Sequence, residues 1–351
     1  MKEKKQIRAM IKFCLVGVLM AIALGSLSAH AGSNASVITL KYGSYAPHNI
    51  IDDPILWYLD EVSKRSGVTI KTETYFAGTL AGPQDCLGAI GIGVYDIGWI
   101  SPVFNPDKIP YAIIPNATPV VSVPLTTSLK AANEFTRTFQ PAVQELEKAN
   151  VKFLFHSGAW YYDLISTKSV RTYEDLKGLR VRTFGYLAKA WVELGGTAVS
   201  ISIPEVYSSL QKGVLDAVLS QPVSMSKTLH LSDIAKHYTK IHFGCLSVPV
   251  IMNMKTWNRL PEQVRQTMTD IAKEMPAIAD EIISKAELDA IVTMEKEGIS
   301  INELPPSDMA LNRDASNKVI QIIVSDLSAK GASSAGEAMD IYLKAIDTFS
   351  K

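Results

Sequence analysis

Hydrophobic and polar residues change period several times along the chain. VITLKYG (37–43) and VTIKTETYF (68–76) alternate in steps of two, as strands do when one face is buried. The segment between them predicts a helix that starts at Asp52-Asp53-Pro54, stops at Gly67 and carries apolar residues at helical spacing, namely Ile55, Leu56, Leu59 and Val62. A helix over about 83–92 and an apolar strand, YDIGWIS (95–101), follow. The predicted order is βαβαβ.

The same order returns later in the chain. GLRVRTF (178–184) predicts a strand, 186–194 a helix ended by two glycines, TAVSIS (197–202) a strand and PEVYSSLQKG (204–213) a helix. GVLDAVLSQP (213–222) then echoes GVYDIGWISP (93–102), since in each a glycine ends a helix and an aspartate precedes a buried strand. Two such units predict two doubly wound, parallel α/β sheets.

The remaining segments predict how the two units are joined. Residues 103–125 are rich in proline and predict a surface loop, followed by a helical stretch that is interrupted near Pro141. VKFLFHSGAWYYDLIS (151–166) is long enough to cross between units, and CLSVPVIMN (245–253) predicts a second crossing. After Pro261 an amphipathic helix runs to about Lys296 with a bend near Pro276, and a short strand and two helices complete the chain.

These crossings predict two lobes, because 351 residues exceed the size at which one core usually stops growing. Lobe 1 is predicted over 36–160 with about 248–282, and lobe 2 over 161–247 with about 283–351. Ligands of doubly wound sheets collect beyond the carboxyl ends of the strands. The side chains expected there, in a cleft between the lobes, are Tyr45, Ser101, Arg182, Phe184, Ser220 and Gln221.

The amino terminus predicts export. Residues 1–31 combine a basic start, an apolar run of about 15 residues and a small-x-small cleavage site before Gly32, whereas a membrane span needs roughly 20 apolar residues. No cysteine follows the predicted cleavage site, so we expect a free periplasmic protein. Loss of the leader removes five basic residues and one acidic residue and leaves 30 basic and 34 acidic residues, a balance that does not favour nucleic-acid binding.

The sequence lacks the common motifs of serine hydrolases, zinc proteases and nucleotide-binding proteins. The sequence contains no GxSxG, no HExxH and no phosphate-binding glycine loop, because GAIGIG (88–93) closes a helix where such a loop would open one. His230, His237 and His242 have no regular ligand spacing, so we expect no metal site, no cofactor and no enzyme activity. In an oxidising compartment, Cys86 and Cys245 can form either a disulfide or two buried thiols.

Three runs carry a resemblance to a known family. TYEDLKGLRVRTFG (172–185), SIPEVYSSLQKGVLDAV (202–218) and MNMKTWNRLPEQVRQTM (252–268) resemble the extracytoplasmic solute-binding proteins of tripartite ATP-independent periplasmic (TRAP) transporters, the DctP family. LKYGSYAP (40–47) is also similar to theirs. The resemblance implies a two-lobed, periplasmic-binding-protein-like α/β fold. It also implies that the protein binds a small organic acid and delivers it to a small and a large membrane subunit.

The resemblance also implies roles for individual residues. The family's carboxylate-binding arginine corresponds to Arg182, for which the residues alone favour pairing with an internal acid over contact with a ligand. Many relatives have an asparagine where this chain has Ser220, and sugar-acid binders carry a second arginine where this chain has Trp160, Tyr161 and Tyr162. These departures favour a monocarboxylate with an apolar or aromatic body.

Other side chains complete the expected site. Aromatic walls are predicted from Tyr45, Trp160, Tyr162 and Phe184. Ser101, Ser220 and Gln221 could each bind a ligand oxygen or cap a loop, and Tyr207 is a weaker candidate on its helix. The alternative functions are a binding protein of an ATP-driven importer, a periplasmic sensor subunit, and a secreted hydrolase. Ligand identity, a bridging metal and the oligomeric state stay open.

Overall fold

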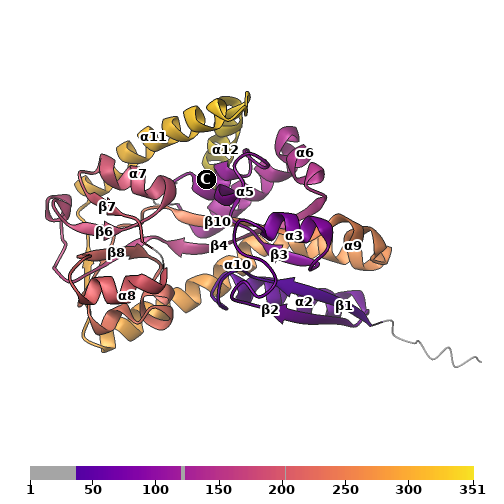
Figure 1. Ribbon diagram of the computed structural model, residues 1–351, viewed down its shortest axis with the longest axis horizontal. Coiled ribbons are helices and arrows are strands. Elements are labelled where there is room, and N and C mark those ends of the chain that lie inside the picture. Colours follow the sequence, from indigo (N-terminus) through magenta and orange to yellow (C-terminus); the bar gives the residue numbers. More distant parts are fainter. Residues whose placement is uncertain (1–36, 120–122, 202) are drawn as a thin grey trace, which may run out of the picture. The chain divides into compact units, whose positions relative to one another are not determined.

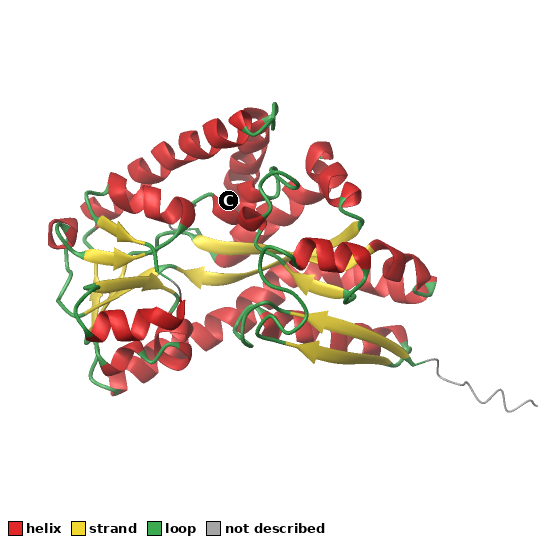
Figure 2. Cartoon of the chain, in the orientation of Figure 1, coloured by secondary structure: helices red, strands yellow, loops and turns green. Residues whose placement is uncertain are grey.

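Two β-sheets organise the chain, as Figures 1 and 2 show. The computed structural model describes residues 37–119, 123–201 and 203–351, apart from the side chains of residues 159, 160, 204, 245 and 246. The predicted leader, residues 1–31, lies outside the described residues. Residues 38–351 form one compact unit, in which we call the sheet β2-β1-β3-β10-β4 with its helices lobe 1 and the sheet β11-β9-β5-β8-β6-β7 with its helices lobe 2.

Both predicted βαβαβ units are confirmed. In lobe 1 the elements are β1 (Ile38–Gly43), α2 (Asp52–Ser66), β2 (Ile70–Tyr75), α3 (Cys86–Ile92) and β3 (Ile97–Trp99). In lobe 2 they are β6 (Arg180–Arg182), α7 (Gly185–Glu193), β7 (Thr197–Val199), α8 (Ile203–Gln211) and β8 (Ala217–Ser220). Each unit places its first strand between the second and the third, and the three strands are parallel. The sequence echo is therefore a repeated architecture.

The two sheets are mixed, which corrects the prediction that they are wholly parallel. In lobe 1, β10 (Cys245–Asn253) runs antiparallel to both β3 and β4 (Val151–Tyr161). In lobe 2, β5 (Asp163–Ser166) runs antiparallel to β8 and to β9 (His237–Lys240), and β11 (Ser300–Glu303) runs parallel to β9. The added strands arrive from the other lobe or after long connections, so the geometry of a βαβ crossover does not fix their direction.

The chain passes between the lobes at the first predicted crossing, but the second predicted crossing, 245–253, is strand β10 of the lobe 1 sheet, so the chain crosses in the loop before it. The long apolar run 151–166 breaks at Tyr162, which leaves β4 in lobe 1 and β5 in lobe 2. Helix α10 (Glu262–Lys296) packs Met268 and Met275 into the lobe 1 core and Ile291 and Met294 into a lobe 2 core, with Pro276 inside the helix. Three segments therefore tie the lobes together, namely the β4–β5 strand, the loop before β10 and α10.

The remaining helices cover the sheets. The predicted loop over 103–125 contains two short helices, η1 (Pro102–Phe104) and α4 (Ile113–Ala117), and helix α5 (Leu125–Thr138) ends just before α6 (Gln140–Lys148). Helix α9 (Met254–Arg259) follows β10, and α11 (Pro306–Ala329) and α12 (Ala335–Phe349) end the chain. Within the described ranges, none of the helices has the length and apolar character needed to span a membrane. The predicted lobe boundaries stay a prediction.

Candidate functional site

The same glycine and aspartate arrangement precedes the third strand of each βαβαβ unit. Gly93 (φ 81°) and Gly213 (φ 68°) both adopt the left-handed conformation that ends a helix. The aspartate that follows each accepts a hydrogen bond from a backbone N–H of the neighbouring strand, Asp96 from Lys41 (2.8 Å) and Asp216 from Arg180 (2.9 Å). This arrangement aligns the first and third strands of each unit, so their carboxyl ends lie at one edge.

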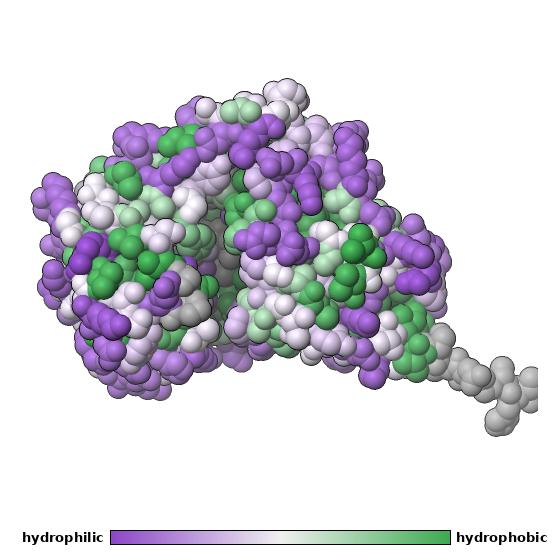
Figure 3. All heavy atoms as spheres, in the orientation of Figure 1, coloured by the Kyte–Doolittle hydropathy of each residue, from purple (hydrophilic) through white to green (hydrophobic). Residues whose placement is uncertain are grey.

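A cavity lies where these edges of the two lobes meet. Lobe 1 contributes the loop after β3 and helix α4, lobe 2 contributes the start of α7, and two residues come from the segments between the lobes. Figure 3 shows that this face is hollowed between the part with β1–β3 and the part with β6–β8. No charged side chain occurs among the described lining residues, which are Ser101, Val103, Asn116, Ala117, Thr118, Pro119, Tyr162, Phe184, Gly185, Tyr186, Leu187 and Gly244.

Arg182 stands beside this cavity at the end of β6. Its guanidinium lies 5.1 Å from the ring centroid of Phe184, which lines the cavity. Burial lowers the pKa of Arg182, while the nearby Tyr162 acts in the opposite direction. The buried Nε has no hydrogen-bond partner, and none of the ion pairs among the described residues involves this arginine. Arg180, two residues earlier, does pair with Asp216 (2.9 Å), so the internal ion pair considered for Arg182 is made by its neighbour.

The start of α7 adds a second source of positive potential. Phe184 occupies the N-cap position, and the first amide to bond within the helix is that of Ala188, which donates to the Phe184 carbonyl (3.1 Å). The residues before it, Gly185 to Leu187, line the cavity. Amides in the first turn of a helix lack intrahelical partners and attract anions. An anion between these amides and Arg182 would be favoured by both.

Aromatic rings form much of the remaining wall. Tyr162, only 4% exposed, packs edge-on against Phe184 with ring centroids 5.8 Å apart, and Phe184 is 38% exposed. Tyr45 packs on Trp99 (4.5 Å), and burial raises the pKa of Tyr45 far above its usual value, so its hydroxyl stays protonated. The side chain of Trp160 lies outside the described residues. The structure thus brings Tyr162 and Phe184 together beside Arg182, whereas Tyr45 packs on Trp99 and Phe104 and is not among the described lining residues.

The lobe 1 wall carries a neutral polar pair. The Ser101 hydroxyl donates to Oδ1 of Asn116 (3.4 Å), and Nδ2 of Asn116 donates to the Ser247 carbonyl on β10 (2.8 Å). Sequence reasoning missed Asn116. The available signal was an amide inside the apolar, proline-rich run IIPNATP, where a buried polar side chain needs partners.

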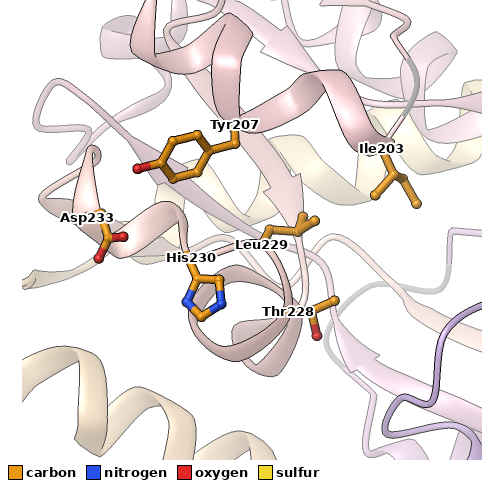
Figure 4. Close-up of a pocket in the computed structure, with 6 residues that line it drawn as sticks. All are labelled: Ile203, Tyr207, Thr228, Leu229, His230 and Asp233. Carbon is orange, nitrogen blue, oxygen red and sulfur yellow. The ribbon is translucent and has the colours of Figure 1, made fainter.

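Three predicted site residues lie elsewhere. Ser220 and Gln221 are buried at the end of β8, where the Ser220 hydroxyl donates to Oε1 of Gln221 (3.4 Å), and neither lines the cavity. Tyr207 lines a separate open hollow on lobe 2 with Ile203, Thr228, Leu229, His230 and Asp233 (Figure 4). In that view the Tyr207 ring comes from α8 and lies across the hollow from His230.

The cysteine and metal predictions concern other positions. Cys86 is a buried free thiol whose Sγ donates to the Gly82 carbonyl (3.0 Å), so it forms no disulfide with Cys245. Across the described part of the chain, no group of three or more histidine, cysteine, aspartate or glutamate side chains is arranged to hold a metal ion.

One carboxylate organises the two chain crossings next to the cavity. Asp163 is fully buried and accepts hydrogen bonds from the backbone N–H groups of Ile241 (2.9 Å) and His242 (2.8 Å). The backbone N–H of Tyr162 also donates to the Gly244 carbonyl (3.1 Å). Hydrogen bonds therefore join the β4–β5 strand to the loop before β10, where both segments pass from one lobe to the other. Sequence reasoning did not identify this contact, because its partners lie far apart along the chain.

Comparison with known proteins identifies relatives. The family model described as "Bacterial extracellular solute-binding protein, family 7" (DctP) matches residues 48–326. A solute-binding protein of Albidiferax ferrireducens is 25% identical over 293 residues, which cover 80% of this chain and 81% of the relative. A Sulfitobacter solute-binding protein is 27% identical over 169 residues, about half of each chain.

Solved structures resemble the whole described fold. A TRAP periplasmic solute-binding protein from Desulfovibrio salexigens has a TM-score of 0.76 and 25% identity, and the match covers 88% of this chain and 96% of that one. A Rhodoferax ferrireducens protein in complex with copurified benzoate has a TM-score of 0.76 and 19% identity, covering 89% and 98%. A Sulfitobacter protein with bound β-D-galacturonate has a TM-score of 0.66 and 19% identity, covering 87% and 99%. The two-lobed α/β fold predicted from the sequence is confirmed.

Proposed function

This chain belongs to family 7 of the bacterial extracellular solute-binding proteins, and from that premise we propose that it captures a small monocarboxylate with an apolar or aromatic body. It does so in the periplasm, in the cavity between the lobes, and delivers the acid to the small and large membrane subunits of a TRAP transporter. Arg182 binds the carboxylate, and Tyr45, Tyr162 and Phe184 enclose the body of the ligand.

The observation that carries this proposal is the guanidinium of Arg182, whose buried Nε has no hydrogen-bond partner and which makes no ion pair within the described part of the chain. Arg182 is half-buried and stays charged, so an anion beside it in the cavity is favoured. An unpartnered Nε and the first amides of α7 beside the cavity fit a carboxylate. A charge-assisted hydrogen bond contributes about 1.5–3 kcal/mol, whereas micromolar affinity corresponds to about 8 kcal/mol. Apolar contacts and closure of the lobes must supply the rest.

The composition of the cavity wall favours one carboxylate over two. No lysine, arginine or histidine occurs among its described lining residues, so a second carboxylate would be desolvated without a cation. The structural neighbours hold acids as different as benzoate and galacturonate, so the fold alone does not select the ligand. Selection rests on this chain's side chains, and an aromatic wall suits an acid with an apolar body.

Hinge closure is the mechanism that fits the size of the cavity. Its volume is about 60 Å³, well below the ~300 Å³ or more of pockets that hold small molecules. The lobes must therefore separate to admit a ligand, by rotation about the segments that Asp163 holds together. Closure around the acid excludes water, which strengthens the contact between the carboxylate and Arg182.

Titration calorimetry on the mature protein tests the proposal. We expect benzoate or phenylacetate to bind, and Arg182→Ala to weaken that binding at least about tenfold, the equivalent of 1.4 kcal/mol. Arg180→Ala is the matched control, because this arginine lies two residues away on the same strand but pairs with Asp216. It should leave the affinity within about twofold.

Two results would contradict the assignment. Unchanged affinity in the Arg182→Ala protein would remove this residue from the site. Binding of succinate or galacturonate alone, with no response to any aromatic monocarboxylate, would reject the proposed class of ligand. Melting curves of both variants without ligand check that each is folded.

A further inference from the structure

Two neutral polar groups stand on the lobe 1 wall of the cavity, opposite the positive potential at Arg182 and the start of α7. They are the Ser101 hydroxyl and the Asn116 amide. The other polar side chain on this wall, Thr118, donates its proton to the Ile114 carbonyl (2.6 Å). The remaining described residues of this wall, Val103, Ala117 and Pro119, carry no polar side chain. Any polar contact to lobe 1 side chains is thus concentrated at Ser101 and Asn116.

Asn116 is held in one orientation. It is 8% exposed, and its Nδ2 donates to the carbonyl of Ser247 on strand β10 (2.8 Å). A flipped amide would place Oδ1 against that carbonyl and leave a buried donor without a partner, which is costly. Oδ1 of Asn116 therefore faces Ser101. Strand β10 thus fixes the orientation of the Asn116 side chain in the cavity wall.

The orientation of Asn116 decides whether the Ser101 hydroxyl can donate or accept a hydrogen bond in the cavity. A serine hydroxyl has one proton and two acceptor sites. The proton of Ser101 points to Oδ1 of Asn116, so the hydroxyl meets a ligand at the cavity wall as an acceptor. The wall is thus suited to receive a hydroxyl proton from a ligand.

We propose that the physiological acid carries a neutral hydroxyl group remote from its carboxylate, and that Ser101 accepts the hydrogen bond from this group while Asn116 positions Ser101. This inference rests on the proposed function, since it assumes that the carboxylate binds at Arg182. The ligand then spans the cavity, with its charged end at lobe 2 and its hydroxyl at lobe 1. It contacts both lobes, so it favours the closed arrangement over the open one.

Matched pairs of acids test the proposal by calorimetry. Phenylacetate is compared with its 3-hydroxy and 4-hydroxy derivatives on the unmodified mature protein. We expect at least one hydroxylated acid to bind about fivefold more tightly than phenylacetate, the ratio that one hydrogen bond of ordinary strength provides. In Ser101→Ala this ratio should fall to about one, with phenylacetate measured on the same variant as the reference.

Asn116→Ala separates positioning from direct contact. It keeps the Ser101 hydroxyl but frees its proton, so the preference for the hydroxylated acid should shrink. A purely structural role would instead weaken all three acids together. The ratio between acids is therefore the readout, and melting curves without ligand confirm that each variant is folded.

The outcomes separate this inference from the proposed function. If phenylacetate binds in an Arg182-dependent way but neither hydroxylated acid binds better, or if the preference persists in Ser101→Ala, the inference is wrong and the proposed function stands. If no monocarboxylate binds the unmodified protein, both are wrong.

Discussion

The half-buried Arg182 and the fully buried Glu287 each have a side-chain atom without a hydrogen-bond partner, and their charges respond in opposite ways. Glu287 on α10 is fully buried, accepts a hydrogen bond from the N–H of Val223 (2.7 Å) and leaves Oε1 without a partner. Burial raises the pKa of Glu287 to about 8, and the Asp163 carboxylate acts in the same direction. Glu287 can thus shed its charge by binding a proton. Arginine has no such route, so Arg182 stays charged and favours an anion beside it.

The raised pKa of Glu287 predicts a pH dependence of stability. Between the unfolded pKa of about 4.5 and the folded value of about 8, the folded state holds more protons than the unfolded state, so the free energy of unfolding falls as the pH rises. The slope is on the order of 1 kcal/mol per pH unit for one such group. We expect Glu287→Gln to become more stable relative to the unmodified protein as the pH rises from 5 to 8, in urea unfolding at a series of pH values.

A matched comparison is available within the chain. Burial raises the pKa of Glu145 to about 8 as well, although both its oxygens accept backbone hydrogen bonds, from Tyr111 (3.0 Å) and Ala112 (2.6 Å). Glu145→Gln should therefore remove a similar part of the slope but lose hydrogen bonding at one oxygen. A pH profile for Glu287→Gln that parallels the unmodified protein would show that Glu287 is ionised in the folded state.

At the scale of elements, the repeated aspartates link the strands of each unit. Each carboxylate accepts a backbone N–H from the adjacent first strand, and Asp96 also accepts the hydroxyl proton of Thr256 on α9 (2.7 Å). Removal of either carboxylate leaves strand donors without this partner. We expect Asp96→Ala and Asp216→Ala each to lower the free energy of unfolding by about 1–3 kcal/mol, as measured by urea denaturation.

An exposed aspartate provides the control for this prediction. Asp60 on α2 pairs with Lys64 (2.6 Å) one helical turn away, and both side chains are more than half exposed. Asp60→Ala should cost less than about 0.5 kcal/mol. If Asp96→Ala and Asp216→Ala cost no more than Asp60→Ala, the aspartates of the repeat do not align the strands. Because the two sites lie in different sheets, the double variant should show an additive loss.

At the scale of the whole molecule, one ligand contact should control the arrangement of the lobes. Under the proposed function, the ligand enters an open form of the cavity, whose present volume is about 60 Å³, and is enclosed on closure. We expect saturating phenylacetate to reduce the radius of gyration of the unmodified protein in small-angle X-ray scattering. Arg182→Ala at the same ligand concentration should show no reduction, because the closed form gains its advantage from bound ligand.

An unchanged radius of gyration would speak against closure if calorimetry shows that the unmodified protein is saturated. A reduction that persists in Arg182→Ala, at ligand concentrations where this variant binds nothing, would mean that closure does not depend on the ligand.

The sequence by itself determined the local elements. The periods of two and of 3.6, together with Gly67, Gly93 and Gly213, predicted the helices and strands of both units, because these signals act between residues close along the chain. The repeated order also predicted which strand ends would face the cleft; Ser101 and Phe184 line the cavity, whereas Tyr45, Ser220 and Gln221 are not among its described lining residues.

Only the tertiary structure decided which of these side chains are left without partners. Asp163 contacts residues 241 and 242, and Glu287 contacts Val223, across separations that no local pattern reports. Because β10 lies antiparallel beside β3, the Ser247 carbonyl reaches the Asn116 amide. Asn116 in turn orients the Ser101 hydroxyl. Strand pairing in space also decides that Arg180 meets Asp216. It likewise decides that no acid pairs with Arg182 among the described residues. Local periodicity sets which face of an element is buried, but its long-range partners follow only from the packing of whole elements.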